Sequence, residues 1–276
     1  MRREGWIGAG VVIGAVGAAV GGLTYGGREL LHRQAAIARD VIGKPLGEQA
    51  PNADKVYKKR FGDPADLLML GDSLAAGLGA DLPSETLGAR LAKGTAKRIH
   101  RSVRLTTAAR VGNHTSELAE QIDSLPAAYR PEVAVIVVGG NDVTHRHPVP
   151  ESVAHLEAAI RRLQERGAEV VVGTCPDLGM LRAVPQPLRS LGSLASRQLA
   201  TAQRTAALAL GARVVDLARM AGPFFVTNPD EMFSVDRFHP SSLGYRRTAK
   251  AMLPSVVAAF GGEVEVPLGH HVPLVR

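Results

Sequence analysis

Short aliphatic runs alternate with helical patterns over most of this chain, and no other feature constrains its fold as strongly. The runs are continuous rather than alternating in polarity, which is typical of strands covered on both faces of a sheet. Strands that alternate with helices form parallel sheets, because each helix carries the chain back between them. We therefore expect an α/β domain over residues 61–260, a parallel sheet with helices on both faces. Five strands are predicted: Asp66–Leu70, Val103–Ala108, Val133–Val138, Glu169–Thr174 and Arg213–Asp216.

The segments between these runs carry apolar residues at spacings of three and four, as amphipathic helices do. Glu151–Arg166 shows the pattern most clearly. Ser84 and Thr115 are expected to cap two earlier helices, and Ser241 or Ser242 is expected to begin the last one. In a sheet of this kind ligands bind at the carboxyl ends of the strands. The residues that follow each run are therefore the candidate site residues.

The N-terminal part of the chain contains an uncharged run from Gly5 to Gly27, 23 residues long. As a helix, this run is long enough to span the ~30 Å hydrocarbon core of a bilayer. Trp6 and Tyr25 lie near its ends, where aromatic rings prefer the interface. We expect residues 1–27 to be a membrane anchor or an uncleaved signal segment. Two alternatives stay open: a signal peptide cleaved near Gly17, and a buried or disordered Gly/Ala-rich leader.

The positive charge of the chain is concentrated before the α/β domain. The formal net charge is +7, from 33 basic and 26 acidic residues, and residues 1–60 contribute about five of these charges. The domain itself is nearly neutral, which argues against a nucleic-acid partner. We expect residues 28–60 to be a basic, solvated connector, with contact to anionic lipid as the alternative, and residues 261–276 to be a C-terminal tail. The single cysteine excludes an intramolecular disulfide and a CxxC metal or redox motif.

Four short motifs lie at the predicted strand ends. The first run is followed by Gly71-Asp72-Ser73-Leu74, and the next two are followed by Gly112-Asn113-His114 and Gly139-Gly140-Asn141-Asp142. Glycine N–H groups and an asparagine amide are neutral donors suited to an oxyanion that forms only in the transition state. The fourth motif, Asp236-Arg237-Phe238-His239, places an acid three residues before a histidine, so that one loop can supply a base and the carboxylate that orients it.

These four motifs resemble those of the SGNH hydrolases, the GDSL esterase/lipase family, over about residues 64–258. The resemblance implies a flavodoxin-like three-layer α/β/α sandwich and an enzyme without a cofactor or metal. Carried over by position, it implies Ser73 as nucleophile, His239 as general base and Asp236 as the acid that orients His239. It implies an oxyanion hole formed by the Ser73 N–H, the Gly112 N–H and the Asn141 side chain.

The resemblance implies a serine esterase or lipase that cleaves acyl or lipid esters through an acyl-enzyme. A carbohydrate O-deacetylase or acyltransferase on envelope glycans would use the same motifs, and a degenerate lipid- or glycan-binding module is the non-enzyme alternative. Many bacterial family members with such a leader act outside the cytoplasm, so we expect a domain at the cell membrane or exported. Lys and Arg after residue 27 favour the opposite orientation, because basic residues tend to stay in the cytoplasm.

Several other polar residues near these motifs have simpler interpretations. Asp72 is expected to stabilise the turn at Ser73 rather than to act as a catalytic acid. His145 and His147 are expected to line the rim of the site rather than to bind a metal. Cys175 is expected to be a small buried residue. The segment 179–187 is apolar and rich in turn residues, and we expect it to contact the acyl group of a substrate.

Overall fold

The structure, a computed structural model, describes residues 26–43, 45–265 and 270–271. The expected membrane segment, residues 5–27, lies almost entirely outside the described residues. Within the part of the chain that is described, no helix is both long and apolar enough to cross a membrane.

One mixed sheet of seven strands forms the centre of the domain, in the order β1-β3-β2-β4-β5-β6-β7. The five inner strands are parallel, and the two-residue strands β1 and β7 pair antiparallel at the edges. The five predicted strands are thus confirmed, whereas sequence patterns did not reveal the two short edge strands. The strand bounds are β1 Val56–Tyr57, β2 Pro64–Gly71, β3 Ser102–Thr107, β4 Val133–Val137, β5 Glu169–Gly173, β6 Arg213–Val215 and β7 His270–His271.

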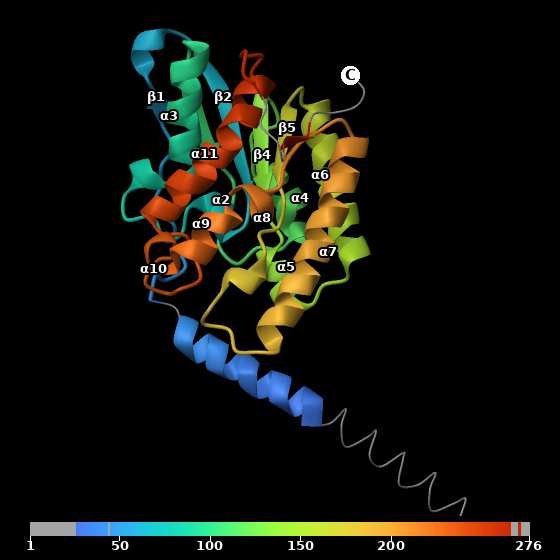
Figure 1. The fold of residues 1–276 in the computed structure, drawn as a ribbon. Coiled ribbons are helices and arrows are strands. Elements are labelled where there is room, and N and C mark those ends of the chain that lie inside the picture. Colours follow the sequence, from blue (N-terminus) through green and yellow to red (C-terminus); the bar gives the residue numbers. More distant parts are fainter. Residues whose placement is uncertain (1–25, 44, 266–269, 272–276) are drawn as a thin grey trace, which may run out of the picture.

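Helices cover both faces of the sheet, giving the expected α/β/α sandwich (Figure 1). Helices α3 and α11 pack together on one face, and α4, α6 and α7 lie on the other. Short helices gather at the carboxyl ends of the strands. The helix bounds are α2 Ser73–Ala76, α3 Leu87–Ile99, α4 Leu118–Asp123, α5 Gly140–His145, α6 Val149–Glu165, α7 Leu188–Ala209, α8 Leu217–Met220, α9 Gly222–Thr227, α10 Pro229–Met232 and α11 Ser242–Ala259.

Two expected helix caps differ from those in the structure. Helix α3 is capped by Thr86, whose hydroxyl accepts a hydrogen bond from the Ala89 N–H at 3.2 Å, and not by Ser84. Thr115 instead begins a single 3-10 turn, Thr115–Glu117, that precedes α4. Ser241 caps α11 as expected, accepting from the Gly244 N–H.

Alternate residues of each strand face opposite layers, which explains the continuous apolar runs. In β2, Leu67 and Met69 pack in the core beneath α3 and α11, and Leu68 and Leu70 pack in the core beneath α4, α6 and α7. All four side chains are fully buried. Because both faces are covered, neither set of alternate positions can be polar.

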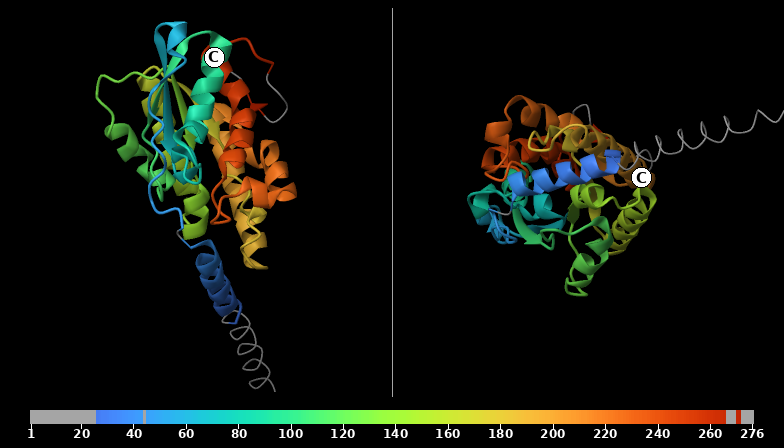
Figure 2. Two further views of the ribbon diagram at one scale, coloured as in Figure 1. Left: turned by 90° about the vertical axis from the view of Figure 1, so that its left-hand side faces the viewer. Right: turned by 90° about the horizontal axis from the view of Figure 1, so that it is seen from below.

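Residues 28–60 are mostly exposed to solvent, as expected for a connector, but they also contain regular structure that contacts the domain. An N-terminal helix, described over residues 26–42, lies across the underside of the domain (Figure 2). Its Gln34 and Ala38 are buried. Farther along, the Val56–Tyr57 strand joins the sheet edge. The apolar residues among the charges lie three, four or seven apart and form a face that packs on the domain, so the segment is folded despite its net charge.

Two residues of the expected C-terminal tail form the short strand β7. His270 and His271 pair with Val215 and Val214 of β6. The His270 Nδ1 atom lies 2.6 Å from the Ser255 hydroxyl on α11. This short strand closes the β6 edge of the sheet.

Gly71, the last residue of β2, holds the tightest backbone contact at the carboxyl edge of the sheet. Its φ is +131°, and a Cβ atom there would lie 1.8 Å from the Val137 carbonyl oxygen of β4. The contact cannot be relieved by a side-chain rotation, because the obstructing atom belongs to the backbone of the central strand. Glycine is therefore required where the first motif leaves the sheet.

We predict that Gly71→Ala lowers the free energy of unfolding by more than about 3 kcal/mol, because the strand ends must separate to accommodate the methyl group. Gly167→Ala is the matched control: Gly167 also has a positive φ, of +83°, but a Cβ there would meet nothing within 4 Å. That control should cost only about 1–2 kcal/mol of backbone strain. Urea unfolding followed by circular dichroism measures both, and equal losses would contradict the steric argument.

Candidate active site

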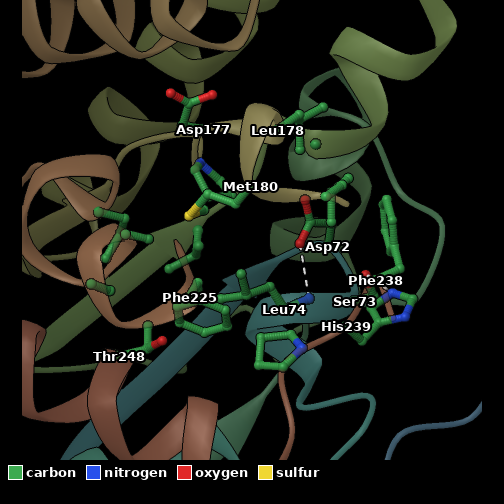
Figure 3. Close-up of a pocket in the computed structure, with 18 of the residues that line it drawn as sticks. Asp72, Ser73, Leu74, Asp177, Leu178, Met180, Phe225, Phe238, His239 and Thr248 are labelled. Atoms are coloured by element: carbon green, nitrogen blue, oxygen red, sulfur yellow. Dashed lines mark hydrogen bonds between the residues drawn. The ribbon is translucent and has the colours of Figure 1, made fainter. Parts of the chain in front are cut away.

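Ser73 is the first residue of α2, on the turn that follows β2. Asp72 caps this short helix: its carboxylate accepts a hydrogen bond from the Leu74 N–H at 2.9 Å (Figure 3). The Asp72 N–H in turn donates to the Val137 carbonyl. The turn is therefore fixed to β4 on one side and to its own helix on the other, as expected for Asp72 as a turn-stabilising residue.

The amide of Gln121 fixes the backbone just before this turn. Its Oε1 accepts from the Gly71 N–H at 2.9 Å, and its Nε2 donates to the Gly71 carbonyl at 2.8 Å. Gln121 lies on α4, fifty residues along the chain, and is fully buried. Because both polar groups of the amide are bonded to one residue, the side chain holds the end of β2 in a single orientation.

Asp236 and His239 reach Ser73 from the loop before α11. The His239 Nε2 atom lies 2.9 Å from the Ser73 hydroxyl oxygen, and the His239 Nδ1 atom lies 2.5 Å from the Asp236 carboxylate. The loop itself is closed by the Ser234 N–H, which donates to the His239 carbonyl at 2.8 Å. Arg237 adopts a left-handed conformation, with φ of +56°, which turns the chain between the acid and the histidine.

The Asp236 carboxylate is held in its charged form by hydrogen bonds. Burial alone would raise its pKa, but bonds from the His239 side chain and from the N–H groups of Phe238 and His239 outweigh the burial and lower the pKa of Asp236. Only 3% of the residue is exposed. A buried, ionised carboxylate that accepts from Nδ1 leaves Nε2 of His239 as the atom that faces Ser73.

The second and third motifs are bound to each other on the other side of Ser73. The Asn141 amide donates to the Asn113 carbonyl at 2.9 Å. The Asp142 carboxylate, which is buried, accepts from the Thr115 N–H at 3.1 Å and from the Ser152 hydroxyl at 2.7 Å. These bonds join the loop after β3 to the start of α5.

All three donors expected for the oxyanion hole border one cavity of about 420 Å³ together with His239. Ser73 is the first residue of its helix, so its N–H has no intrahelical acceptor. Among the described residues, the Gly112 N–H makes no hydrogen bond, and Asn141 has a second amide N–H beyond the one that binds Asn113. The structure thus places every sequence-predicted site residue around one space.

The pKa of Asp72 is shifted in the opposite direction from that of Asp236, because fewer hydrogen-bond donors reach the buried Asp72 carboxyl group. Burial raises the pKa of Asp72 to about 6, against the opposing effect of hydrogen bonds from the Leu74 and Gly139 backbone N–H groups. The nearby Asp142 carboxylate raises it further. Two carboxylates of the same site therefore have pKa values shifted in opposite directions by their surroundings.

Three histidines lie together next to the expected oxyanion hole. The His114 ring stacks on that of His147, with centroids 4.5 Å apart, and meets that of His145 edge-on at 4.8 Å. Within the described residues no group of three or more His, Cys, Asp or Glu side chains is placed to hold a metal ion. The three rings therefore pack against one another, and a position of His145 and His147 at the rim of the site stays a prediction.

An apolar cavity extends from Ser73 to Gly222 and Phe225 of α9, and Figure 3 shows residues that line it. Phe225 and Thr248 border its far end, and Ser73, Phe238 and His239 border its near end. Its volume is about 80 Å³. Two of its lining residues, Met180 and Leu181, belong to the segment 179–187 that is expected to contact an acyl group, and Leu178 lies just before that segment.

Sequence patterns did not identify the buried amides that support this site. Besides Gln121, Gln203 of α7 accepts from the Cys175 N–H at 2.7 Å and donates to the Val138 carbonyl at 3.0 Å. Cys175 is fully buried, as expected, and burial raises the pKa of its thiol well above the usual value. In the sequence, the only sign of these two residues is a glutamine on the inner, otherwise apolar face of a helix. Such a residue interrupts the apolar pattern but does not indicate which group its amide binds.

We predict that Asp72→Asn stabilises the protein only where Asp72 is ionised. Asparagine keeps an acceptor for the Leu74 N–H but carries no charge. Since the pKa of Asp72 is raised from 3.8 to about 6 on folding, wild type loses stability as the pH rises from about 4 to above 6 and the variant does not. The gain should be near zero at pH 4 and up to about 3 kcal/mol at pH 8.

Denaturant unfolding at a series of pH values measures this difference. Asp216→Asn is the control, because Asp216 also caps a helix but is not buried. The control should show no comparable rise, and a pH-independent effect of Asp72→Asn would contradict the role of burial.

Comparison with known proteins supports the resemblance to the GDSL esterase/lipase family. Residues 69–247 match the model of the GDSL-like Lipase/Acylhydrolase family. The chain is 38% identical to the GDSL-like esterase Rv1075c of Mycobacterium tuberculosis over 267 residues, 93% of this chain and 84% of that protein.

Solved structures share the fold. A lipase/acylhydrolase from Enterococcus faecalis superposes with a TM-score of 0.58 at 21% identity, over 70% of this chain and 96% of its own. The esterase EstA from Pseudoalteromonas sp., also determined inhibited by monoethylphosphonate, gives 0.56 at 20% identity, over 71% and 99% of the two chains. The chain therefore belongs to the GDSL-like lipase/acylhydrolase family of ester-hydrolysing enzymes, the SGNH hydrolases.

Proposed function

We propose that this protein is a serine esterase that hydrolyses carboxylic esters of aliphatic acyl groups through an acyl-enzyme on Ser73. The observation that carries this proposal is the continuous hydrogen-bonded series from Asp236 through His239 to the Ser73 hydroxyl, with distances of 2.5 and 2.9 Å. A serine hydroxyl is a weak nucleophile until an adjacent base removes its proton. His239 is placed to do so, and Asp236 stabilises the imidazolium that forms.

The first half of the reaction forms the acyl-enzyme. Ser73 Oγ attacks the ester carbonyl carbon while its proton moves to His239 Nε2, and the carbonyl oxygen becomes an oxyanion. The Ser73 N–H, the Gly112 N–H and the free N–H of Asn141 stabilise that charge. The intermediate collapses when the alkoxide leaves with the proton from His239, and the acyl group stays on Ser73.

The second half releases the acid. A water molecule gives a proton to His239 and attacks the acyl carbon, and the same donors stabilise the second oxyanion. When this intermediate collapses, Ser73 regains its proton from His239. Because the donors are backbone and amide groups held by the Asp142 and Asn113 contacts, they need no reorganisation during the reaction.

The apolar surroundings of Ser73 favour an aliphatic acyl group over a sugar. Leu74, Leu181, Phe225 and Phe233 border the cavity next to the nucleophile. Asp177 and Thr248 are among the few polar residues that border it. A sugar hydroxyl buried against the apolar side chains would lack a partner, and an unpaired buried hydroxyl costs about 1–3 kcal/mol. An acyl chain has no such cost.

We predict that Ser73→Ala lowers kcat for p-nitrophenyl butyrate by about 10⁶, because the nucleophile is lost. The same substitution should abolish covalent labelling by a fluorophosphonate probe. Ser84→Ala, at an exposed serine on the same domain, should leave hydrolysis and labelling unchanged. Near-wild-type hydrolysis by a folded Ser73→Ala protein would overturn the assignment of Ser73. Turnover of acetylated sugars in preference to esters of simple alcohols would instead contradict the proposed substrate class.

We predict that Asn141→Ala lowers kcat by about 10²–10³, the usual effect of removing one oxyanion donor. KM for a short ester should change little, because the amide contacts charge that develops only in the transition state. Steady-state kinetics give both constants. A large rise in KM with an unchanged kcat would assign Asn141 to substrate binding instead.

A further inference from the structure

The N-terminal helix (residues 26–42) presents a distinct face to the catalytic domain. Leu31, Ala35, Ala38 and Ile42 are buried or half-buried, whereas Ala36 between them is exposed. Their spacing of three and four residues gives one side of a helix. The helix precedes residues 69–247, which match the family model.

Gln34 fixes this helix to the loop that precedes α7. Its Oε1 accepts from the Leu188 N–H at 3.0 Å, and its Nε2 donates to the Gln186 carbonyl. The residue is only 7% exposed. Since the amide is bonded to the loop through both its polar groups, it sets the rotation of the helix about its own axis and directs the face of Leu31 and Ala35 inward.

A groove of about 620 Å³ is bordered on one side by Leu31, Ala35, Ala38 and Ile42 of this face and on the other by the domain. Apolar side chains from the segment that precedes α7 and from α7 itself form the opposite wall: Leu178, Leu181, Val184, Leu188, Leu191 and Ala195. Three arginines border the groove: Arg39 and Arg146 are exposed, and Arg189 is half-buried. Long arginine side chains can line an apolar surface with their methylene groups while the guanidinium stays in water. The groove is thus mainly apolar on both sides, with three basic residues along it.

The groove opens toward the nucleophile. Ile42 and Gly43 border both the groove and the cavity that contains Ser73, Gly112 and Asn141. Phe238 borders the groove, that cavity and the smaller apolar cavity beside Ser73. Its ring packs edge-on against the His239 ring, with centroids 4.9 Å apart. An alkyl chain that leaves the reacting carbon past Phe238 would therefore enter the groove.

We propose that this groove binds the long alkyl chain of the ester substrate, and that the N-terminal helix is one wall of the substrate site. The proposal rests on the proposed function of Ser73 as the nucleophile. Transfer of each methylene from water to an apolar groove is favourable, so activity should rise with chain length. The chain could belong to the acyl or to the alcohol part of the ester, and both have the same chemistry.

The test compares two neighbouring alanines in the full-length protein. Ala35→Trp places an indole in the groove, and Ala36→Trp places it on the exposed side of the same helix. The substrates are p-nitrophenyl acetate, p-nitrophenyl dodecanoate and dodecyl acetate, at concentrations where each is monomeric. In wild type, kcat/KM should be higher for at least one of the two long-chain esters, p-nitrophenyl dodecanoate or dodecyl acetate, than for p-nitrophenyl acetate.

Ala35→Trp should lower kcat/KM for the preferred long ester about 10–100-fold and leave p-nitrophenyl acetate within about twofold. Ala36→Trp should leave both unchanged. Loss on the dodecanoate assigns the groove to the acyl chain, and loss on dodecyl acetate assigns it to the alcohol. Unchanged selectivity in Ala35→Trp, or no preference for long chains in wild type, overturns the proposal.

A second variant covers the case in which Ala35→Trp unfolds or lowers all activities. Ala195→Trp fills the groove from the opposite wall and should give the same selective loss, and an unchanged long-chain preference there overturns the proposal. Fluorophosphonate labelling of Ser73 distinguishes a failure of the proposed function from a failure of the groove proposal alone. If wild type neither labels nor cleaves any ester, the proposed function fails. If it labels and cleaves short esters without using the groove, only this inference fails.

Discussion

The contact between Gly71 and the Val137 carbonyl determines where the reacting groups can meet. Two parallel strands approach so closely at their carboxyl ends that only a hydrogen atom fits between them. The turn to Ser73 begins at that point, and Gln121 holds its backbone from below. With Ser73, the proposed nucleophile, fixed to the centre of the sheet, the remaining groups need only be brought to it by loops from neighbouring strands. Each of those loops is secured by its own hydrogen bonds.

Electrostatics at the site depend on the number of donors that reach each carboxylate. Asp236 accepts from one side chain and two backbone N–H groups and stays ionised despite burial. Asp72 is buried with weaker compensation, so its pKa is raised to about 6. Both acids lie close enough to His239 to interact with it, yet only the one bonded to His239 Nδ1 is suited to stabilise an imidazolium. The other holds a turn, at a cost in stability above its pKa.

The sequence predicted the inner strands and the four motifs because these signals are local. An apolar run or a glycine before a serine requires no knowledge of distant residues. The supporting contacts could not be predicted in the same way. Gln121 binds Gly71 and Gln34 binds the loop at Gln186 and Leu188, across separations of 50 and more than 150 residues. A charged composition suggested a solvated connector over 28–60, but its apolar face and one glutamine were enough to fold it onto the domain.

The helix of residues 26–42 connects the uncharged N-terminal run to the groove beside Ser73, so its position bears on how a substrate reaches the site. The 17 described residues of the helix, 26–42, are only about 25 Å long, and in the sequence they begin at the end of the uncharged run from Gly5 to Gly27. If that run is held in a bilayer, the groove lies within one short helix of the lipid surface. Esters with long alkyl chains partition into lipid and are scarce in water, so a wall built from the helix next to the anchor would receive them where they are concentrated. The same residues would then tether the enzyme and select its substrate.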